Sequence, residues 1–344
     1  MKEIKIGKNE EGIKLKKLCF MYFKGMPESF TYKMLRKKNI LLNSKKAAGD
    51  EILKDGDTIQ LFFSDDTLTS LRKESLRAAE KLPALSDFPW LTKDRIIYET
   101  DDMLFIDKPS GILSQRSDEE ELSVNDAVIA YLLGKGTVTP ESLQLFRPSV
   151  CNRLDRNTCG IISASKTRKG AQELTSFYRS SDERSIGKYY LTVVHGHCTL
   201  KGHFDRLEYV KAKIDNQAYV WMKGGKRPPE TAAFGKPVPI YTELYPLAYD
   251  KNRDVSLMLC RLHTGRSHQI RVTMKHYGFH VVGDPKYGNP VRDHFQNATE
   301  IGQLLVAWRM KLPDGVWIEA SIPDKILSYF PDAAERASKV TEER

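Results

Sequence analysis

Arg153-Leu-Asp-Arg-Asn-Thr-Cys-Gly-Ile-Ile162 is the stretch around which the rest of this sequence is organised. Its one carboxylate, Asp155, lies between two arginines, whose positive charges favour the ionised form of the acid. Gly160 allows a tight turn of the backbone before the apolar strand expected at 161–164. Charged clusters of this kind are common on solvated surfaces, so the role of Asp155 has to be inferred from the other segments of the chain.

The length and composition are those of a basic protein with two domains. At 344 residues the chain exceeds the ~100–200 residues of a usual domain. The formal charge is 54 minus 45, or +9, which favours polyanionic partners such as nucleic acid. Five cysteines form no Cys-x-x-Cys pair, which argues against a disulfide framework or a thiolate zinc site and indicates a reducing cytoplasm. No run approaches the ~18 apolar residues of a membrane span, so no membrane partner is expected.

The first segment, residues 1–65, is predicted to form a small separate module. Its expected elements are helices at 15–23 and 29–38, strands at 40–42 and 58–63, and a turn at 45–46. Ser29 or Thr31 is expected to cap the second helix. The segment carries 14 Lys or Arg against 9 Asp or Glu, and the difference of 5 is more than half of the whole-chain excess of +9.

The basic residues of this module gather where the second helix meets the following hairpin: Lys33, Arg36, Lys37, Lys38, Lys45 and Lys46. This arrangement resembles the αL motif of the ribosomal-protein-S-four-like RNA-binding domain, and Asp55-Gly-Asp-Thr-Ile59 is similar to the end of that domain. The resemblance implies that the six side chains contact RNA phosphates. The alternative is a solvated helix face without a ligand.

The remainder is predicted to be a linker at 66–94, partly helical at 71–81, a large domain at 95–330 and a C-terminal tail at 331–344. Within the large domain we expect strands at 96–98, 103–106 and 188–194 and several irregular strands between 203 and 262. Helices are expected after Ser123 and at 167–178. The pattern is that of an α+β fold in which a mainly antiparallel sheet dominates.

Four further segments carry candidate functional residues: Lys108-Pro-Ser-Gly111, Lys188-Tyr-Tyr-Leu191, Leu262-His-Thr-Gly-Arg-Ser-His-Gln-Ile-Arg271 and Gly283-Asp-Pro-Lys-Tyr-Gly288. Taken singly, each is common as a turn, a loop or a half-buried strand. Together with the stretch around Asp155, in this order and spacing, they resemble the RluA-type family of pseudouridine synthases over residues 95–323. An S-four-like module joined to such a domain is a known arrangement in that family.

The resemblance implies a role for each matched residue. Asp155 corresponds to the catalytic aspartate, and Arg271 to the arginine that pairs with it. Tyr190 corresponds to the active-site tyrosine that stacks on the base and takes part in proton transfer. Arg153 corresponds to the residue that enters the RNA stack when the uridine leaves it, and Ile270 to a wall of the pocket. Lys108-Pro109 and Gly283-Asp284 correspond to structural motifs.

The reaction implied is the isomerisation of specific uridines to pseudouridine, with base flipping, most often in large-subunit (23S) ribosomal RNA. Transfer RNA is the other substrate class. The reaction requires neither cofactor nor metal, and we expect a monomer with no obligatory protein partner. The two histidines His263 and His268 are five apart, which does not place them on one helix face, so a metal site is not expected there.

Two other interpretations give different functions. In one, the chain binds RNA and assists ribosome assembly without catalysis, but such a protein would not need Asp155, Tyr190 and Arg271 together. In the other, His263 and His268 cleave RNA. The sequence also departs from the family at Asn152 and Cys159, where histidine and serine are usual, and at residues 303–308, which lack the usual Leu-His-Ala.

Overall fold

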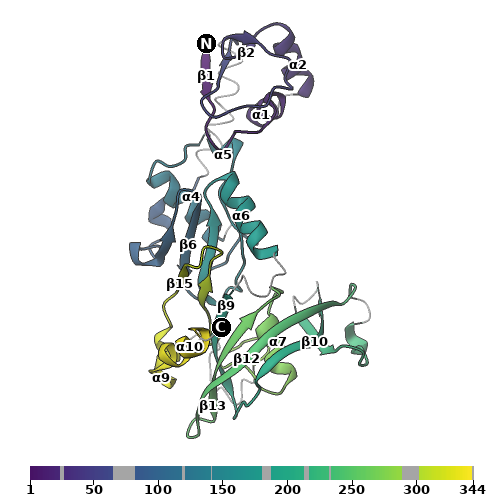
Figure 1. Cartoon of the computed structure of the whole chain (residues 1–344), viewed down its shortest axis with the longest axis vertical. Helices are drawn as coiled ribbons and strands as arrows, with labels where there is room; N and C mark the ends of the chain where they lie inside the picture. Colours follow the sequence, from purple (N-terminus) through teal and green to yellow (C-terminus); the bar gives the residue numbers. More distant parts are fainter. Residues whose placement is uncertain are drawn as a thin grey trace.

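The computed structural model describes residues 1–23, 27–64, 82–117, 121–140, 142–179, 187–212, 217–231, 234–288 and 302–342. In Figure 1 the N-terminal module lies at the top, the helices α4 and α6 flank a narrow part of the sheet below it, and a wider part of the same sheet lies at the bottom. The helix predicted at 71–81 lies outside the described residues.

The N-terminal module is a four-stranded antiparallel sheet in the order β1-β4-β2-β3, with two helices packed on it. Its elements are β1 (Lys2–Lys5), α1 (Leu15–Tyr22), α2 (Glu28–Arg36), β2 (Ile40–Leu42), β3 (Lys45–Lys46) and β4 (Thr58–Leu61). Its core is apolar throughout and contains Leu15, Leu18 and Phe23 from the first predicted helix.

Two local predictions in this module are wrong. The second helix begins at Glu28 after Pro27, so Ser29 and Thr31 lie inside it and do not cap it. The hairpin turn is formed by Asn43 and Ser44, not by the lysine pair. Both turn residues have positive φ, 49° and 63°, and Leu42 pairs with Lys45 across a two-residue loop of the type that favours asparagine.

The sheet of the large domain has eleven strands in the order β11-β10-β12-β13-β9-β14-β8-β6-β5, with β15 paired to β14 and β7 to β8. Among the described strands only β8 and β14 pair in parallel, which fits the predicted α+β fold with a mainly antiparallel sheet. The strands are β5 (Ile96–Glu99), β6 (Met103–Lys108), β7 (Ser149–Val150), β8 (Cys159–Ser165), β9 (Gly187–His195), β10 (Gly202–Lys211), β11 (Ala218–Met222), β12 (Val238–Asp250), β13 (Val255–Leu262), β14 (Leu305–Lys311) and β15 (Trp317–Glu319).

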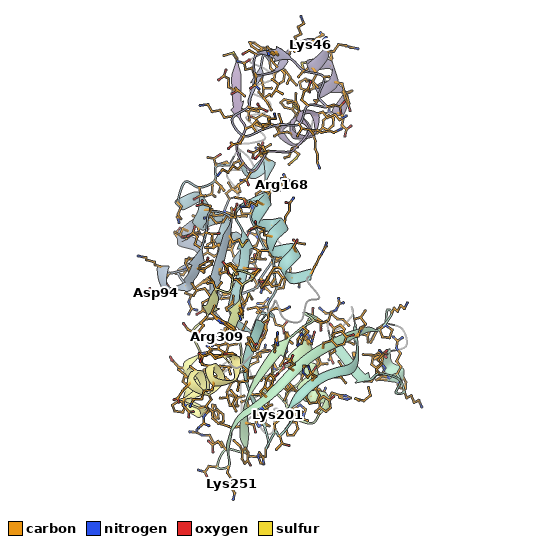
Figure 2. The ribbon with its side chains drawn as sticks, in the orientation of Figure 1. Lys46, Asp94, Arg168, Lys201, Lys251 and Arg309 are labelled. Atoms are coloured by element: carbon orange, nitrogen blue, oxygen red, sulfur yellow. The ribbon has the colours of Figure 1, made fainter. Side chains whose placement is uncertain are left out.

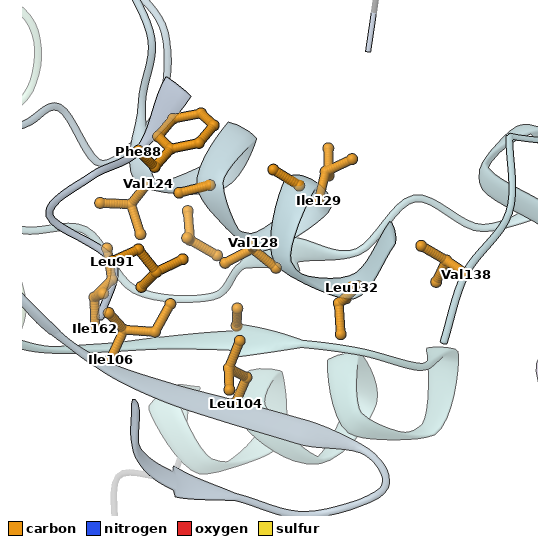
Figure 3. Close-up of a cluster of buried hydrophobic side chains, with 14 of the residues drawn as sticks. Phe88, Leu91, Leu104, Ile106, Val124, Val128, Ile129, Leu132, Val138 and Ile162 are labelled. Carbon is orange, nitrogen blue, oxygen red and sulfur yellow. The ribbon is translucent and has the colours of Figure 1, made fainter. Parts of the chain in front are cut away.

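Two helices cover opposite faces of the narrow part of the sheet. On one face, α4 (Val124–Gly134) packs against Leu104 and Ile106, as Figure 3 shows. On the other, α6 (Arg168–Arg179) packs against Phe105, whose side chain points the opposite way because residues alternate along a strand. Ser123 precedes α4 as predicted, and its backbone N–H donates to Asp126 in a capping box.

Residues at both predicted boundaries pack on this domain. Within 82–94 the short 3-10 helices η1 (Leu85–Asp87) and η2 (Lys93–Arg95) flank Phe88 and Leu91, which are buried against α4. The predicted tail contains α10 (Ala333–Glu342), which follows α9 (Asp324–Tyr329) and buries Ala333 and Ala337 against the wide part of the sheet. The domain boundaries themselves stay a prediction.

The N-terminal module contacts the large domain through the short helix α5 (Ser142–Leu145). Leu145 is buried in the core of the module itself. Beside it, the backbone N–H and Nε of Arg168 donate to the side-chain and backbone oxygens of Asn9 at 3.1 and 3.2 Å. Figure 2 shows Arg168 at this joint. The module is therefore held by apolar burial and by hydrogen bonds.

The centre of the large sheet is the row of three strands β9, β14 and β8. Gly160 of β8 pairs with Ala307 of β14, which in turn pairs with Tyr190 of β9. Gly160 has φ +102°, and a Cβ there would lie 2.2 Å from the Ala307 carbonyl oxygen. The glycine thus lies within a strand and permits close strand contact, instead of forming the tight turn expected from the sequence.

Two general features concern the chain as a whole. All five cysteines are free. None of the helices in the described part of the chain combines the length and apolar character that crossing a membrane requires.

Candidate active site

Asp155 lies in the loop between β7 and β8 and lines a pocket of about 820 Å³. The pocket lies where the loop meets β9 and the N-terminal end of α7 (Gln269–His276). Its lining includes Tyr190 and Arg271, so the structure brings three of the predicted site residues together. The side chain of Asp155 is 22 % exposed, which leaves it accessible from the pocket.

The backbone of this loop is fastened by Lys108 and Ser114. Sequence reasoning assigned Lys108 only to a structural motif and gave Ser114 no role. Buried Lys108 donates to three backbone carbonyls, those of Pro109, Ile112 and Arg156, at 2.8 to 2.9 Å. Ser114 Oγ donates to Leu154 O and accepts from Leu154 N. Burial lowers the pKa of Lys108 to about 7, whereas three carbonyl acceptors favour the ammonium form, which alone has three N–H donors.

Arg271, on α7, is shared between two carboxylates. Its Nη1 donates to Asp155 Oδ2 at 2.7 Å, while Nε and Nη2 donate to Asp284 at 2.7 and 2.8 Å. The Asp284 carboxylate also accepts the backbone N–H groups of Lys286 and Tyr287. Hydrogen bonds and charge from Arg271, opposed by burial, hold the pKa of Asp284 below its usual value. The guanidinium is therefore fixed on one side and presents one N–H to Asp155.

His268, which precedes α7 in a left-handed conformation with φ 60°, faces the second oxygen of Asp155. Its Nε2 lies 3.8 Å from Oδ1, too far for a hydrogen bond. Its Nδ1 lies 2.8 Å from the Tyr287 hydroxyl, which accepts the Ala218 N–H and so directs its own proton at Nδ1. Burial lowers the pKa of His268 to about 4, so the imidazole is neutral near pH 7.

Tyr190 is partly buried beside Leu262 and Ile270 and contributes its side chain to the same pocket. Among the described residues its hydroxyl has no hydrogen-bond partner. Burial, and then the negative charge of Asp155, raise the pKa of Tyr190 well above its ordinary value. The phenol is therefore protonated at neutral pH and can donate a hydrogen bond to a bound group.

The two arginines that flank Asp155 have different surroundings. Arg153 is exposed at the rim of the pocket and forms no ion pair within the described part of the chain. Arg156 instead binds Glu121 through two hydrogen bonds of 2.6 Å. The sequence-based idea that both flanking arginines hold the Asp155 charge is therefore wrong, and Arg271 is the arginine in contact.

The charged side chains around the pocket are mainly basic. Asp155 is the one carboxylate among the described residues of the lining, and the basic side chains there are Arg153, Arg156, Lys188, Lys211, Arg266, Arg271 and Lys286. Such an excess attracts phosphate groups. None of Lys188, Arg266 and Lys286 was assigned a role, although each lies within a segment singled out from the sequence. Lys211 lies outside those segments, and a single lysine on a strand carries no spacing signal of its own.

Of the remaining predicted residues, Ile270 lines a cavity together with Asp155 and Tyr190, whereas the six basic residues belong to the N-terminal module. Ile270 is buried and lines a small cavity of about 50 Å³ that adjoins the pocket. All six predicted basic residues of the N-terminal module are exposed and form no side-chain ion pair within the described residues. Figure 2 shows Lys46 at the end of the module that points away from the catalytic domain.

The two departures from the family pattern beside Asp155 have structural partners. The amide oxygen of Asn152 accepts the backbone N–H and hydroxyl of Ser163 at 2.7 and 3.0 Å, which fastens the loop to β8. Cys159 Sγ lies 3.6 Å from the carbonyl of Leu305 on β14. Neither residue contacts Asp155, so both contribute to the support of the loop.

One group of metal-ligand type occurs among the described residues, namely His203, Glu243 and His263. This group lies on the sheet face opposite Tyr190. Glu243 pairs with Arg261 and therefore shares its face, whereas Tyr190 pairs with the neighbouring Cys260. Neighbouring residues of a strand point to opposite faces of the sheet. Although burial opposes it, contacts from His263, Tyr245 and Arg261 lower the pKa of Glu243 to about 2. The carboxylate is thus already paired, and His263 and His268 belong to separate clusters.

Comparison with known proteins identifies the family to which this chain belongs. A sequence profile described as RNA pseudouridylate synthase matches residues 102–276, which include Asp155, Tyr190 and Arg271. An uncharacterized RNA pseudouridine synthase of Mycoplasma pneumoniae is 28% identical over 82% of this chain and 79% of its own length. The ribosomal large subunit pseudouridine synthase C of Escherichia coli is 26% identical over 88% of this chain and 84% of its own.

A solved structure supports the fold. The human RNA pseudouridylate synthase domain containing 4 superposes with a TM-score of 0.51 at 17% sequence identity, covering 77% of this chain and 97% of that one. At this identity the likeness concerns the arrangement of strands and helices alone.

Proposed function

The chain belongs to the RNA pseudouridylate synthase family, and on that premise we propose that it isomerises uridines of large-subunit ribosomal RNA with Asp155 as the catalytic carboxylate. The observation that carries the proposal is the contact between Asp155 and Arg271 inside a pocket that also contains Tyr190. Pure RNA binding would not require a carboxylate at the centre of a basic pocket.

The reaction sets clear demands on such a site. The bond between uracil N1 and the ribose breaks, the base turns, and a bond forms between the ribose and carbon five. The proton on carbon five leaves and N1 gains one, so substrate and product are isomers with no redox change. A site for this chemistry needs a carboxylate near the sugar, a group that handles the proton and a pocket that retains the detached base.

Asp155 meets the first demand through its free oxygen. Oδ2 accepts from Arg271, whereas Oδ1 has no hydrogen bond within the described residues and is 3.8 Å from the neutral His268. Oδ1 is therefore the oxygen available to the ribose or base. Arg271 stabilises the ionised carboxylate, and removal of one member of a buried ion pair typically costs ~3–5 kcal/mol.

Tyr190 can handle the proton and can help to retain the detached base in the pocket. Its ring lies in the wall of the pocket, where an aromatic side chain can stack on a uracil. Its hydroxyl can donate a hydrogen bond to the base, because the raised pKa of Tyr190 disfavours the phenolate. For proton transfer the phenol must give its own proton to N1 and take up the one that leaves carbon five, which regenerates the phenol. The same side chain thus serves as a stacking surface and as a proton-handling group.

Arg153 is suited to base flipping. A uridine stacked in RNA cannot reach Asp155, so the base must leave the stack at a cost of a few kcal/mol. Arg153 is exposed at the pocket rim and has no ion pair within the described part of the chain to hold it back. We assign it the position vacated by the flipped base.

Ribosomal RNA is proposed as the substrate because relatives such as the Escherichia coli protein are named ribosomal large subunit pseudouridine synthases. The six exposed basic residues of the N-terminal module supply additional phosphate contacts. No cofactor is needed for the isomerisation.

The proposal is tested by tritium release from unmodified large-subunit ribosomal RNA labelled at carbon five of uridine. The native chain and Asp101→Asn, which alters an exposed aspartate in the turn before β6, should release tritium, and Asp155→Asn should not. If neither the native chain nor Asp155→Asn releases tritium while both bind RNA, the chain is a non-catalytic RNA-binding protein. Strand cleavage that depends on His268 would instead indicate a nuclease.

A further inference from the structure

A second groove of about 760 Å³ lies on the catalytic domain beside the N-terminal end of α4. The described side chains that line it are all polar: Gln115, Arg116, Ser123, Asn125, Asp126, Arg147 and Ser149. Gln115 also lines the active-site pocket, so the two hollows adjoin. Nothing in the catalytic reaction described above uses this groove.

The groove flanks the joint between the two domains. Arg147 comes two residues after Leu145, which is buried in the core of the N-terminal module. The residue between them, Phe146, lies under the guanidinium of Arg168 at 5.7 Å, and Arg168 in turn binds Asn9 of the module. Arg147 therefore lies beside the module, because the two residues that precede it are both fixed at the joint.

The described side chains that line the groove carry a net positive charge. Among them the one carboxylate, Asp126, accepts from Arg116 Nε at 2.9 Å and from the backbone N–H and hydroxyl of Ser123. That acid is thus neutralised within the protein. Arg147 is exposed and has no partner among the described residues, so its guanidinium is available to a ligand.

We propose that this groove holds the ribose–phosphate backbone of the RNA strand that flanks the target uridine, with Arg147 on a phosphate and Gln115 at the passage to the active site. This inference rests on the proposed function and extends it to a path from the pocket toward the module. An all-polar lining with one uncompensated cation fits a phosphate chain and does not fit an apolar peptide.

The test is the affinity of the full chain for unmodified large-subunit ribosomal RNA, measured by filter binding at several salt concentrations. Arg147→Gln should weaken binding about tenfold and reduce the salt slope by ~0.7–0.9, the value for one phosphate contact. Arg147→Lys keeps the charge and should retain most of the slope. Lys251→Gln removes an exposed charge at the opposite end of the molecule in Figure 2 and should change neither quantity.

A photo-crosslinking amino acid at position 147 identifies directly which nucleotides of the RNA lie in the groove. It should crosslink to nucleotides beside the modified uridine. Equal affinity and slope for Arg147→Gln and Lys251→Gln, or crosslinks only to protein, would overturn the groove assignment. The binding test does not depend on catalysis. If the native chain released no tritium but its RNA binding depended on Arg147, the proposed function would be refuted and the RNA path would stand.

Discussion

At the scale of single residues, the arrangement around Arg271 explains how a carboxylate remains both charged and available. One guanidinium serves two carboxylates, and the buried Asp284 takes two of its N–H groups while Asp155 takes one. Asp155 is held on a single oxygen as a result. Asp284, assigned from the sequence only to a structural loop, is thus the residue that orients Arg271.

Asp284→Asn should lower kcat at least tenfold and leave the affinity for RNA nearly unchanged. The amide cannot accept both guanidinium N–H groups, so Arg271 loses its orientation toward Asp155. The measurement is steady-state tritium release together with RNA binding, with Asp101→Asn as the matched control. A variant with native kcat would show that Asp284 has no positioning role, and thermal unfolding of each variant checks that it is folded.

His268 should make the folded chain sensitive to acid. Its pKa is 6.5 when free and about 4 when folded, because burial disfavours the imidazolium; Asp155 opposes this shift, and Arg271, Lys211 and Lys286 add to it. The unfolded chain therefore binds a proton that the folded chain does not, and stability falls as pH decreases from about 6.5 to about 4.

The contribution of His268 is isolated by comparing the native chain with His268→Gln. The decrease in stability on acidification should be smaller in the variant by up to ~3 kcal/mol. Thermal unfolding midpoints between pH 7 and pH 4.5 measure the difference, since other titrating groups cancel. Parallel curves for the two proteins would show that His268 is protonated equally easily in both states.

At the scale of elements, the active site depends on the close contact of β8 and β14. Gly160→Ala would place its Cβ 2.2 Å from the Ala307 carbonyl oxygen at φ +102°. We expect a destabilisation of ~3 kcal/mol or more, from steric overlap together with backbone strain. Gly136→Ala is the control, because that glycine has φ +67° and nothing within 4 Å of the added Cβ, and it should cost only ~1 kcal/mol. Similar thermal midpoints for both variants would rule out the steric account.

Element types were predictable wherever the pattern was local and strong. The strand at 188–194, the helix after Ser123 and the pairing of Arg271 with Asp155 all follow from the residues or from the family resemblance. The N-terminal strand β1 and the hairpin turn at Asn43 were missed, because neither has a hydrophobic pattern long enough to read. Lys108 was assigned to a structural motif, but its partners could not be predicted, because they are backbone carbonyls that no residue type identifies.

The contacts that support the Asp155 loop could not be predicted either, because they join residues far apart in the sequence. The loop contacts Ser114, forty residues earlier, while the guanidinium that pairs with its carboxylate is 116 residues later. Such contacts depend on strand order, and here β14 inserts between β8 and β9 from the far end of the chain. Spacing within a segment carries no information about that order.

At the scale of the whole molecule, the N-terminal module exposes six basic side chains and is attached to the rest of the chain at α5. Replacing Lys33, Lys37 and Lys45 together by glutamine should weaken RNA binding and lower the salt slope, by ~0.7–0.9 for each phosphate that the variant no longer binds. Lys14→Gln with Lys16→Gln is the control, since both of those lysines already pair with Asp50. These charge variants are preferable to deletion of the module, which would expose the buried Leu145. Unchanged salt dependence in the triple variant would remove the module from the RNA-binding surface.

We propose that this chain converts uridines of large-subunit ribosomal RNA to pseudouridine with Asp155 as the catalytic residue. This proposal is tested most directly by mapping pseudouridines at nucleotide resolution in ribosomal and transfer RNA from cells that lack the protein, complemented with the native chain or with Asp155→Asn. The account predicts one or more large-subunit positions that are restored by the native chain and not by the variant. Restoration by Asp155→Asn, or no position in large-subunit RNA that depends on the protein, would contradict it.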